Sequence, residues 1–457
     1  MAGERSKWRH KGRYYHGELE KYLRFLVPEG ASVLEIGCGT GELLAAVRPG
    51  RGVGIDISPK MVEKARQNFS HLEFVVDDFE DLQISETFDY IIIAETMGHV
   101  DDVQAAFQGL HKVCTPETRV ITIYYNYLWA PVIRFTELTG IRMKQSLQHW
   151  LPLDDIANLL FLADFDVVKK GYRVLMPIKI PIFSTFCNKF LANMPLFWKM
   201  ALTEVLVSRP MATRRKAVDT TCTVLVPCRN EKGNIEDAIR RTPDMGKQTE
   251  IIFVEGGSSD GTYEECLRVQ AAYPDRDISV LQQDGRGKGD AVRKGFDAAK
   301  NDVLMILDAD LTVPPEDLPK FFAAITTGKG EFINGSRLVY RMEKEAMRFL
   351  NTLGNKFFSR VFTYLFEQRI RDTLCGTKVL WREDYLKIQK GRKYFGDFDP
   401  FGDFDLLFGA VKLNLKITEI PIRYRERTYG STQISRFRHG VLLLKMAWFG
   451  LFKIKWI

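Results

Sequence analysis

Residues 31–57, ASVLEIGCGTGELLAAVRPGRGVGIDI, decide the fold of the first part of the chain. The apolar run 31–36 predicts a buried parallel strand, and 52–57 predicts a second strand that carries Asp56 near its end. A glycine-rich turn separates the first strand from a helix, and its glycines are Gly37, Gly39 and Gly41. Such glycines let the backbone pass close beneath a ligand, and an acidic residue at the tip of the second strand accepts both ribose hydroxyls. The stretch therefore predicts a doubly wound α/β sheet that binds a nucleoside.

The pattern of short apolar runs continues to about residue 175. We expect a helix over 153–162 and strands over four further runs, which are 74–79, 88–94, 119–124 and 166–175. The segment 95–102, ETMGHVDD, follows the fourth strand and should lie at the ligand-binding edge of the sheet. His99 in this segment is a candidate general base, and the alternative is a capping or substrate-positioning residue.

The strings VLEIGCGTG, GVGIDIS and FVVDDF resemble those of class I S-adenosylmethionine-dependent methyltransferases, over about residues 14–175. The resemblance implies S-adenosylmethionine as the cofactor, with Asp77 or Asp78 at the adenine edge. The loop lacks the glycine spacing of a dinucleotide site, so we expect Glu35 and the glycine backbone to meet the charged methionine end of the donor. Nothing in the sequence identifies the methyl acceptor, and we expect the insert 126–150 to shape its pocket.

A second series of strands begins after the basic stretch 211–219. These strands alternate with helices, which predicts another mostly parallel sheet; they are 221–227, 250–254, 278–281 and 303–307. A polar motif follows each strand, at the edge where such sheets bind ligands. The motifs are PCRNE at 227–231, VEGGSSDGT at 254–262, GRGKG at 285–289 and DAD at 308–310.

Two carboxylates, Asp308 and Asp310, follow a buried strand at positions i and i+2. Such a pair can hold a hard divalent cation, Mg²⁺ or Mn²⁺, which neutralises the diphosphate leaving group of a nucleotide sugar. Lys288 in the preceding motif adds a positive charge for the same diphosphate. These residues predict a metal-dependent site for a nucleotide-diphosphate sugar.

The motifs PCRNE, VEGGSSDGT, GKGDAVRKG and DAD, in this order, resemble family-2 glycosyltransferases with the GT-A fold over about residues 221–440. Within that family they are most similar to polyprenyl-phosphate hexosyltransferases. The resemblance implies an inverting transfer of a hexose from a nucleotide sugar to polyprenyl phosphate. Besides Lys288, the residues expected around the nucleotide are Pro227, Arg229, Asn230, Glu231, Glu255, Gly257 and Asp260. Glu255 stands alone where the family usually has two acidic residues.

The residues expected on the acceptor side are basic. They lie in GSR at 335–337, DTLCGTK at 372–378 and PIRYRERTYGS at 421–431. Those expected to hold the acceptor phosphate are Arg337, Lys378, Arg425 and Arg427. A phosphate monoester is largely dianionic at neutral pH, so its glycosylation needs no general base. A hydroxyl acceptor would need one, and Asp403 or Asp405 could serve, although both are also typical of acids at a solvated helix N-terminus.

The chain has 457 residues, a formal net charge of +7 and 45% hydrophobic residues, which are ordinary values for a globular protein of two or three domains. Positive charge is concentrated, together with apolar and aromatic residues, in 174–217 and 423–457. Within them, we expect 175–210 and the tail 441–457 to lie at a membrane interface, the alternative being that they pack as core. The sequence contains no nucleic-acid recognition module, so a nucleic-acid partner is not expected.

These features divide the chain into four expected parts. They are a methyltransferase domain at 1–175, an apolar and basic connecting segment at 176–220, a glycosyltransferase domain at 221–440 and an amphipathic tail at 441–457. No signal sequence opens the chain and no apolar run is long enough to span a bilayer. We therefore expect a cytoplasmic protein bound peripherally to the inner face of the cell membrane, which could form a homo-oligomer. The leading interpretation is a bifunctional enzyme. The alternatives are transfer to a hydroxyl of a surface polysaccharide or glycolipid, and a first domain that only binds its cofactor as a scaffold.

Overall fold

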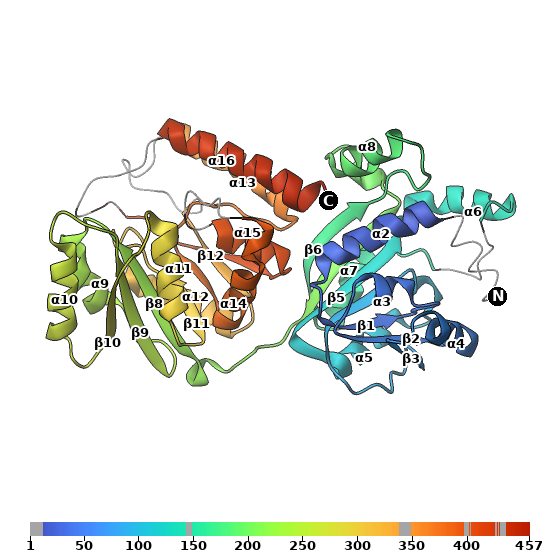
Figure 1. Ribbon diagram of the computed structural model, residues 1–457, viewed down its shortest axis with the longest axis horizontal. Coiled ribbons are helices and arrows are strands. Elements are labelled where there is room, and N and C mark those ends of the chain that lie inside the picture. The colour runs from blue at the N-terminus through green and yellow to red at the C-terminus, as the bar shows by residue number, and fades with distance from the viewer. Residues whose placement is uncertain are drawn as a thin grey trace. The chain divides into compact units, whose positions relative to one another are not determined.

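The computed structural model describes residues 12–142, 149–337, 349–396, 402, 404–425, 427, 429 and 436–457. The chain divides into two units (Figure 1). The first runs to Ala212 and includes Lys455–Ile457, and the second is Thr213–Ile454. Each unit is built around its own seven-stranded α/β sheet, which confirms the two predicted doubly wound domains.

In the first unit the strands lie in the order β3-β2-β1-β4-β5-β7-β6. Their bounds are β1 Ser32–Ile36, β2 Arg51–Asp56, β3 Glu73–Val76, β4 Phe88–Ala94, β5 Cys114–Tyr125, β6 Phe165–Arg173 and β7 Thr203–Pro210. Strands β1 to β5 are parallel, and Leu34 of β1 lies opposite both Val53 of β2 and Ile91 of β4. From β1 the chain adds β2 and β3 on one side of the sheet, and it then crosses to β4 and β5 on the other side, so the strand order reverses between β1 and β4. Sheets of this kind bind ligands beyond the carboxyl ends of the strands at such a switch point.

The helices of this unit are α2 Arg13–Leu26, α3 Glu42–Ala46, α4 Pro59–Asn68, α5 Val103–Gly109, α6 Ala130–Leu138, α7 Leu153–Leu162 and α8 Phe183–Lys189. Helices α3, α4 and α7 contact strands of the sheet directly. In α2, Leu19, Leu23 and Leu26 recur every three or four residues and are all buried. Helix α7 has the bounds that the sequence predicts, and its Ile156 and Leu160 are buried in the core of the sheet.

Strand β7 is the part of the first unit that differs most from the expectation. The sequence predicts a connecting segment at 176–220, but Thr203–Pro210 pairs antiparallel with both β5 and β6, and all of its residues are buried. The first unit therefore continues to Ala212, and the predicted end of this domain at residue 175 is wrong. Glu204 and Arg209 interrupt the apolar pattern of this strand, so the sequence does not predict it. Strand formation here depends on tertiary pairing more than on propensity.

In the second unit the strands lie in the order β10-β9-β8-β11-β13-β12-β14. Their bounds are β8 Thr221–Cys228, β9 Gln248–Glu255, β10 Asp277–Gln282, β11 Val303–Ile306, β12 Phe332–Ser336, β13 Lys378–Trp381 and β14 Ile417–Pro421. Strands β8 to β11 are parallel, and β13 runs antiparallel to its neighbours β11 and β12. The switch point of this sheet lies between β8 and β11, next to the DAD motif.

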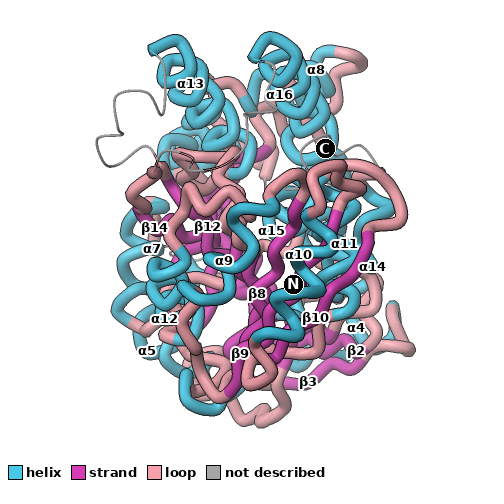
Figure 2. Tube along the Cα trace, turned by 90° about the vertical axis from the view of Figure 1, so that its left-hand side faces the viewer, coloured by secondary structure: helices cyan, strands magenta, loops and turns pink. Residues whose placement is uncertain are grey.

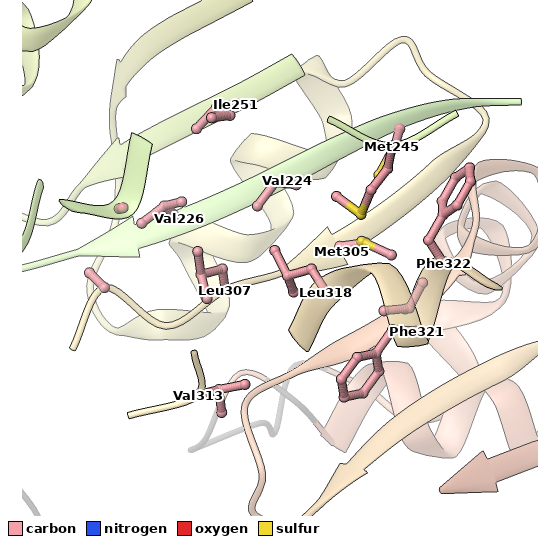
Figure 3. Packing of buried hydrophobic residues seen from close by; sticks show 14 of the residues in the cluster. Val224, Val226, Met245, Ile251, Met305, Leu307, Val313, Leu318, Phe321 and Phe322 are labelled. Atoms are coloured by element: carbon pink, nitrogen blue, oxygen red, sulfur yellow. The ribbon is translucent and has the colours of Figure 1, made fainter. Parts of the chain in front are cut away.

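Helices also cover the second sheet. They are α9 Ile235–Arg241, α10 Thr262–Ala272, α11 Lys288–Ala298, α12 Leu318–Thr326, α13 Phe349–Phe366, α14 Arg382–Gly391, α15 Phe404–Lys412 and α16 Arg436–Gly450. Figure 3 shows the core in which Val224 of β8, Met305 of β11 and Leu318 of α12 pack together, each with no exposed surface. Burying a side chain of this size contributes about 1.5–3 kcal/mol, so the cluster fixes β11 and the carboxylates that follow it.

Helices α13 and α16 lie side by side in the second unit (Figure 2). Leu443, Met446 and Ala447 of α16 are buried. On another face of the same helix Val441, Leu444 and Trp448 are 53%, 52% and 61% exposed. Among the described residues, no helix is both long enough and apolar enough to cross a bilayer.

Candidate functional site

The glycine loop after β1 is confined by two other segments of the first unit. Gly37, Gly39 and Gly41 all have positive φ, at 73°, 56° and 86°. A Cβ on Gly37 would lie 2.1 Å from Oγ1 of Thr96, and one on Gly41 would lie 2.6 Å from the ring of Phe74. The loop therefore requires glycine for its conformation and, at two positions, for space.

The acidic residues after β2 and β3 lie at the same edge of the sheet. Asp56 accepts hydrogen bonds from the backbone N–H groups of Gly39 and Ser58, both at 2.9 Å. Asp77 is buried and accepts a hydrogen bond from the N–H of Asp78 at 2.9 Å, whereas the side chain of Asp78 is exposed. Because β2 and β3 are neighbours, these carboxylates follow the glycine loop along one edge, where ribose and adenine contacts require them.

Glu35 of β1 is bonded to the start of α3. It is 2% exposed, and its carboxylate accepts a hydrogen bond from the N–H of Leu44 at 2.9 Å. A buried glutamate needs a donor, and the unpaired N–H groups in the first turn of α3 supply one. Glu35 therefore supports the first turn of α3, and its contact with the methionine end of the donor stays a prediction. His99 ends the turn Met97–His99 with an exposed side chain, and its role as a base stays a prediction.

Glu95 is the first residue after β4, and the sequence motifs do not single it out. It has a φ of 57° and accepts a hydrogen bond from the hydroxyl of Tyr15 at 2.8 Å. Burial alone would raise the pKa of Glu95, but His16, Tyr125 and Tyr15 outweigh burial and hold the pKa below its usual range. Its place directly after a predicted strand was the signal that could have identified it.

In the second unit, each carboxylate of the DAD motif forms an ion pair. Oδ1 of Asp308 lies 2.6 Å from Nζ of Lys288, at the start of α11. Oδ2 of Asp310 lies 2.7 Å from Nη2 of Arg427, and its Oδ1 accepts hydrogen bonds from the N–H and hydroxyl of Thr312 at 3.1 and 2.8 Å. The structure thus brings together four predicted site residues from three distant parts of the sequence.

Further basic residues surround Asp308. Burial alone would raise the pKa of Asp308, but the positive charges of Lys288, Lys378 and Arg337 outweigh burial and hold it below its usual range. Gly376 packs directly against this carboxylate, since a Cβ there would lie 1.9 Å from its Oδ2 and 2.6 Å from Nζ of Lys288. Asp308 is therefore ionised at neutral pH and has little room to move.

Arg337 forms a buried ion pair with Asp372, a residue that the sequence does not assign to the site. Nε and Nη2 of Arg337 lie 2.7 and 2.8 Å from the two carboxylate oxygens, and its guanidinium lies 5.4 Å from the ring centre of Tyr424. The carboxylate engages two of the five N–H donors of the guanidinium. Arg337 therefore fixes the loop that begins at Asp372 and carries Lys378, and its contact with the acceptor phosphate stays a prediction.

The motifs after β8 and β9 are joined to each other. Oδ1 of Asn230 accepts a hydrogen bond from the N–H of Ser259 at 2.9 Å, and Asn230 itself has a φ of 55°. Asp260 accepts a hydrogen bond from the N–H of Lys232 at 3.3 Å. The two nucleotide-binding loops expected from the sequence are thus held in one arrangement.

Other residues predicted around the nucleotide differ in exposure. Glu255 is 3% exposed and accepts a hydrogen bond from the N–H of Ser258 at 2.5 Å, so its carboxylate closes the loop after β9. Pro227 is half-buried in β8, Arg229 is exposed, and Gly257 has a φ of 69°. Of these four predicted residues, Arg229 has the side chain most accessible to a ligand.

Arg425 and Arg427, from the basic motif PIRYRERTYGS, contact the loop that carries the DAD motif. Arg427 lies 3.3 Å from Glu231 as well as beside Asp310, so it links the loop after β8 to the loop after β11. The N–H of Arg425 donates to the carbonyl oxygen of Thr312 at 3.0 Å, and its side chain is exposed. This segment therefore completes the basic side of the site.

Asp405, one of the two carboxylates proposed as a base for a hydroxyl acceptor, is held by two ion pairs. Asp405 in α15 lies 3.2 Å from Nε of Arg293 and 3.2 Å from Nε of Arg392. Two guanidinium groups favour the charged form of Asp405 and make it a poor proton acceptor. Asp405 is therefore a structural ion-pair residue, which corrects the alternative role predicted for it. Asp403 lies outside the described residues.

In the part of the chain that the structure describes, no three His, Cys, Asp or Glu side chains form a complete metal site. Asp308 and Asp310 nevertheless place two hard oxygen ligands on one loop. Mg²⁺ is usually held by one or two carboxylates together with substrate phosphates, and not by an all-protein cage. The two aspartates therefore fit a divalent cation that is shared with a diphosphate.

Two doubly wound sheets, each with polar residues gathered at its switch point, define a two-domain transferase. The family model described as a methyltransferase domain matches residues 28–158. The model of glycosyl transferase family 2 matches residues 223–387. The two matches fall in the first and second units.

Glycosyltransferase AglJ of Haloferax volcanii is 31% identical over 227 residues, which cover 49% of this chain and 70% of that protein. A dolichol-phosphate mannosyltransferase of Pyrococcus furiosus is 35% identical and covers 46% of this chain, which spans 58% of that protein. An undecaprenyl-phosphate 4-deoxy-4-formamido-L-arabinose transferase of Edwardsiella ictaluri is 38% identical, and the match covers 46% of this chain and 62% of that protein. The chain thus spans less than two thirds of the latter two relatives. It belongs to glycosyl transferase family 2 and carries an S-adenosylmethionine-dependent methyltransferase domain in addition.

Replacing Asp56 by Ala should weaken the binding of S-adenosylmethionine about 30-fold or more, because two ribose hydroxyls each lose a hydrogen bond of about 1–1.5 kcal/mol. Calorimetric titration of the donor measures this affinity. Asp155→Ala, at an exposed site in the first turn of α7, is the matched control and should bind normally. An unchanged affinity in the Asp56 variant would rule out the predicted ribose contact.

Proposed function

We propose that the second unit transfers a hexose from a nucleotide-diphosphate sugar to a polyprenyl phosphate, and that the first unit transfers a methyl group from S-adenosylmethionine. The observation that carries the first part is the convergence of Asp308 with Lys288 and of Asp310 with Arg427 at the switch point of the second sheet. The printed names of two relatives, which refer to dolichol phosphate and undecaprenyl phosphate, support the acceptor class.

The chain's own residues would act mainly by placing charge. A divalent cation held by Asp308 and Asp310 would neutralise the diphosphate leaving group. Lys288 and Arg427 would then contact the diphosphate, because each already lies within 3 Å of one of these carboxylates. Fixed charges in such a site stabilise the leaving group without reorganisation during the reaction.

On the acceptor side, the exposed side chain of Arg425 would hold the phosphate of the lipid, and the buried ammonium group of Lys378 would add positive charge behind it. Nζ of Lys378 donates to the carbonyl oxygen of Cys375 at 2.5 Å, which directs the ammonium group toward the loop that packs on Asp308. A dianionic phosphate oxygen attacks the anomeric carbon from the side opposite the nucleotide, so configuration inverts and no general base is needed. The two ion pairs of Asp405 also favour this route over a hydroxyl acceptor.

The acceptor class can be tested by direct competition. The purified chain would be incubated with a panel of nucleotide sugars, Mg²⁺ or Mn²⁺, and either a short-chain polyprenyl phosphate or the corresponding polyprenol, and the products would be read by mass. We expect a hexosyl phosphoryl polyprenol and no product from the polyprenol. Faster transfer to the alcohol would overturn the proposal.

We further propose that the chain works at the cytosolic face of a membrane, through the exposed apolar side of α16. Val441, Leu444 and Trp448 lie on this side, and Lys445 beside them is exposed to meet anionic headgroups. Burying these side chains adds an apolar contribution, and each nearby lysine adds about 1 kcal/mol at an anionic surface.

Replacing Leu444 and Trp448 together by Gln should lower binding to vesicles of phosphatidylcholine and phosphatidylglycerol about 10-fold or more, since two half-exposed apolar side chains are removed. Vesicle flotation at low and high salt measures the loss. Leu267→Gln, at an exposed apolar position of α10, is the matched control. If both variants float like the parent chain, α16 is not the membrane contact.

A further inference from the structure

Two segments of the first unit leave the same edge of its sheet. Helix α6 follows β5, and residues 174–202, which include α8, join β6 to β7. Strands β5, β7 and β6 are neighbours in that order, and Thr203 of β7 lies opposite both Tyr125 of β5 and Arg173 of β6. The two segments therefore start from adjacent strand ends, and Figure 1 shows α6 and α8 in the upper part of the first unit.

Hydrogen bonds join these two segments to each other. Nδ2 of Asn126, just before α6, donates to the carbonyl oxygen of Lys199 at 2.7 Å. Nε1 of Trp129 donates to the carbonyl oxygen of Met200 at 2.8 Å. The segments thus form one surface, which we call the α6–α8 face. It consists of residues 126–142 and 174–202.

The α6–α8 face exposes large apolar side chains in both of its segments. In and after α6, Phe135, Leu138 and Ile141 are 63%, 85% and 63% exposed. In the second segment, Ile182 and Leu196 are 87% and 80% exposed. Soluble monomers rarely expose apolar side chains over such an extended surface, so the face marks a contact with an apolar partner.

The backbone of Ile182 points to the same conclusion. This residue immediately precedes α8 and has a φ of 65°, a conformation that β-branched residues rarely adopt. Strained backbone of this kind is retained where the surrounding structure or the function requires it. The side chain of Ile182 is almost fully exposed, so packing within the chain does not explain the strain, whereas contact with an apolar phase does.

The exposed charges of the α6–α8 face are of one sign. Lys179, Lys199 and Arg134 are exposed, and residues 174–202 contain no Asp or Glu. In 126–142, all of which the structure describes, Glu137 is the only acid and is half-buried. Apolar side chains interleaved with lysines suit a bilayer surface, because the apolar groups enter it while the ammonium groups stay at anionic headgroups. A second copy of the chain fits less well, since a twofold axis would bring like charges together.

We propose that the α6–α8 face binds a bilayer that contains anionic lipid, and that Leu138, Ile182 and Leu196 enter it below the headgroups. This contact belongs to the first unit and goes beyond the proposed attachment through α16, which belongs to the second. It involves no covalent step and depends on neither transfer reaction. Together with α16, it attaches both units of the chain to the membrane.

Flotation of the full-length chain with vesicles of phosphatidylcholine and phosphatidylglycerol tests the apolar part of the contact. We expect Leu138→Gln combined with Ile182→Gln to lower binding about 10-fold or more, because two apolar side chains no longer enter the bilayer. The loss should persist at high salt, since salt screens only the electrostatic contribution. Phe161→Gln is the matched control and should float like the parent chain. It is an exposed apolar position at the end of α7, close to the start of β6 and hence at the opposite edge of the sheet.

The electrostatic part of the contact is tested with vesicles of two compositions. Lys179→Gln combined with Lys199→Gln should lower binding to vesicles with phosphatidylglycerol about 10-fold or more at low salt, and leave binding to pure phosphatidylcholine unchanged. Lys64→Gln combined with Lys300→Gln removes two exposed lysines outside both proposed contacts, and should bind both vesicles like the parent chain.

A fluorescent label locates the contact without weakening it. Leu196→Cys carrying a nitrobenzoxadiazole group should shift its emission to shorter wavelength when vesicles are added, and the same label at Phe161→Cys should not. The seven native cysteines are buried or half-buried, so the introduced thiol is labelled preferentially. Melting temperatures close to that of the parent chain show that the variants are folded.

The outcomes separate this contact from the one proposed for α16. Normal flotation of the Leu138 and Ile182 variant, together with an unshifted label at Leu196, would overturn the α6–α8 face even if the Leu444 and Trp448 variant fails to float. The reverse result would support the face and contradict the role of α16. A dimer of the parent chain in vesicle-free buffer that the Leu138 and Ile182 variant abolishes would assign the face to a second copy, and would also overturn the proposal.

Discussion

Replacing Asp310 by Asn should lower glycosyl transfer about 1,000-fold or more. The substitution keeps the shape of the side chain and its hydrogen bonds with Thr312, but it removes the negative charge that faces Arg427 and that a divalent cation requires. Loss of a single preorganised electrostatic group commonly costs about 100- to 1,000-fold, and under the proposed mechanism a ligand of the cation would be lost as well. The initial rate of product formation at saturating nucleotide sugar measures the effect.

The second unit offers a matched control for this change. Asp275→Asn, at an exposed turn after α10, removes one negative charge away from the site and should leave the rate unchanged. Donor binding by the first unit, followed by calorimetry with S-adenosylmethionine, should be normal in both variants because that site belongs to the other unit. Transfer that persists in excess chelator, or an Asp310→Asn chain with more than about a tenth of parental activity, would contradict the cation mechanism.

Replacing Gly376 by Ala should lower glycosyl transfer about 300-fold, although the new methyl group touches neither substrate. Its Cβ would lie 1.9 Å from Oδ2 of Asp308 and 2.6 Å from Nζ of Lys288, so this ion pair must move by more than 1 Å. A displacement of about 1 Å in reacting geometry can cost about 100-fold. The rate at saturating substrate checks the prediction, and circular dichroism checks that the fold is retained.

Gly354→Ala is the corresponding control. Gly354 lies inside α13, and a Cβ there would meet nothing within 4 Å. The substitution should keep the activity and stabilise the helix by about 0.5–1 kcal/mol, the usual difference between glycine and alanine in a helix interior. If both alanine variants retain the parental rate, the tight contact between Gly376 and Asp308 does not control the site.

The features that could be predicted from the sequence are those set by local pattern. Helix α7 begins and ends where predicted, because its apolar positions recur at helical spacing. The loops after β1, β8 and β11 lie at the expected edges, because a parallel sheet places every such loop at the carboxyl ends of its strands. Fold class and site location both follow from these regularities.

The features that could not be predicted depend on partners distant in sequence. Arg337 is occupied by Asp372, which is 35 positions away. Asp405 is held by Arg293, which is 112 positions away. The sequence around Arg337 and the sequence around Asp405 do not show that these charged side chains are already paired. Individual side-chain roles were therefore harder to predict than the loops that carry them.

The position of β7 has a consequence for the order of events during protein synthesis. Because β7 fills the gap between β5 and β6, the first sheet cannot close until the ribosome has released residues 203–210, well after β6 has been made. Until then, the edges of β5 and β6 expose unpaired backbone groups, which favour aggregation. Domains generally fold in sequence as they emerge, so the first unit should complete its sheet only as the second begins to form. A nascent chain stalled just after residue 175 should therefore be protease-sensitive and depend on chaperones, whereas one stalled well past residue 212 should already resist proteolysis in its first half.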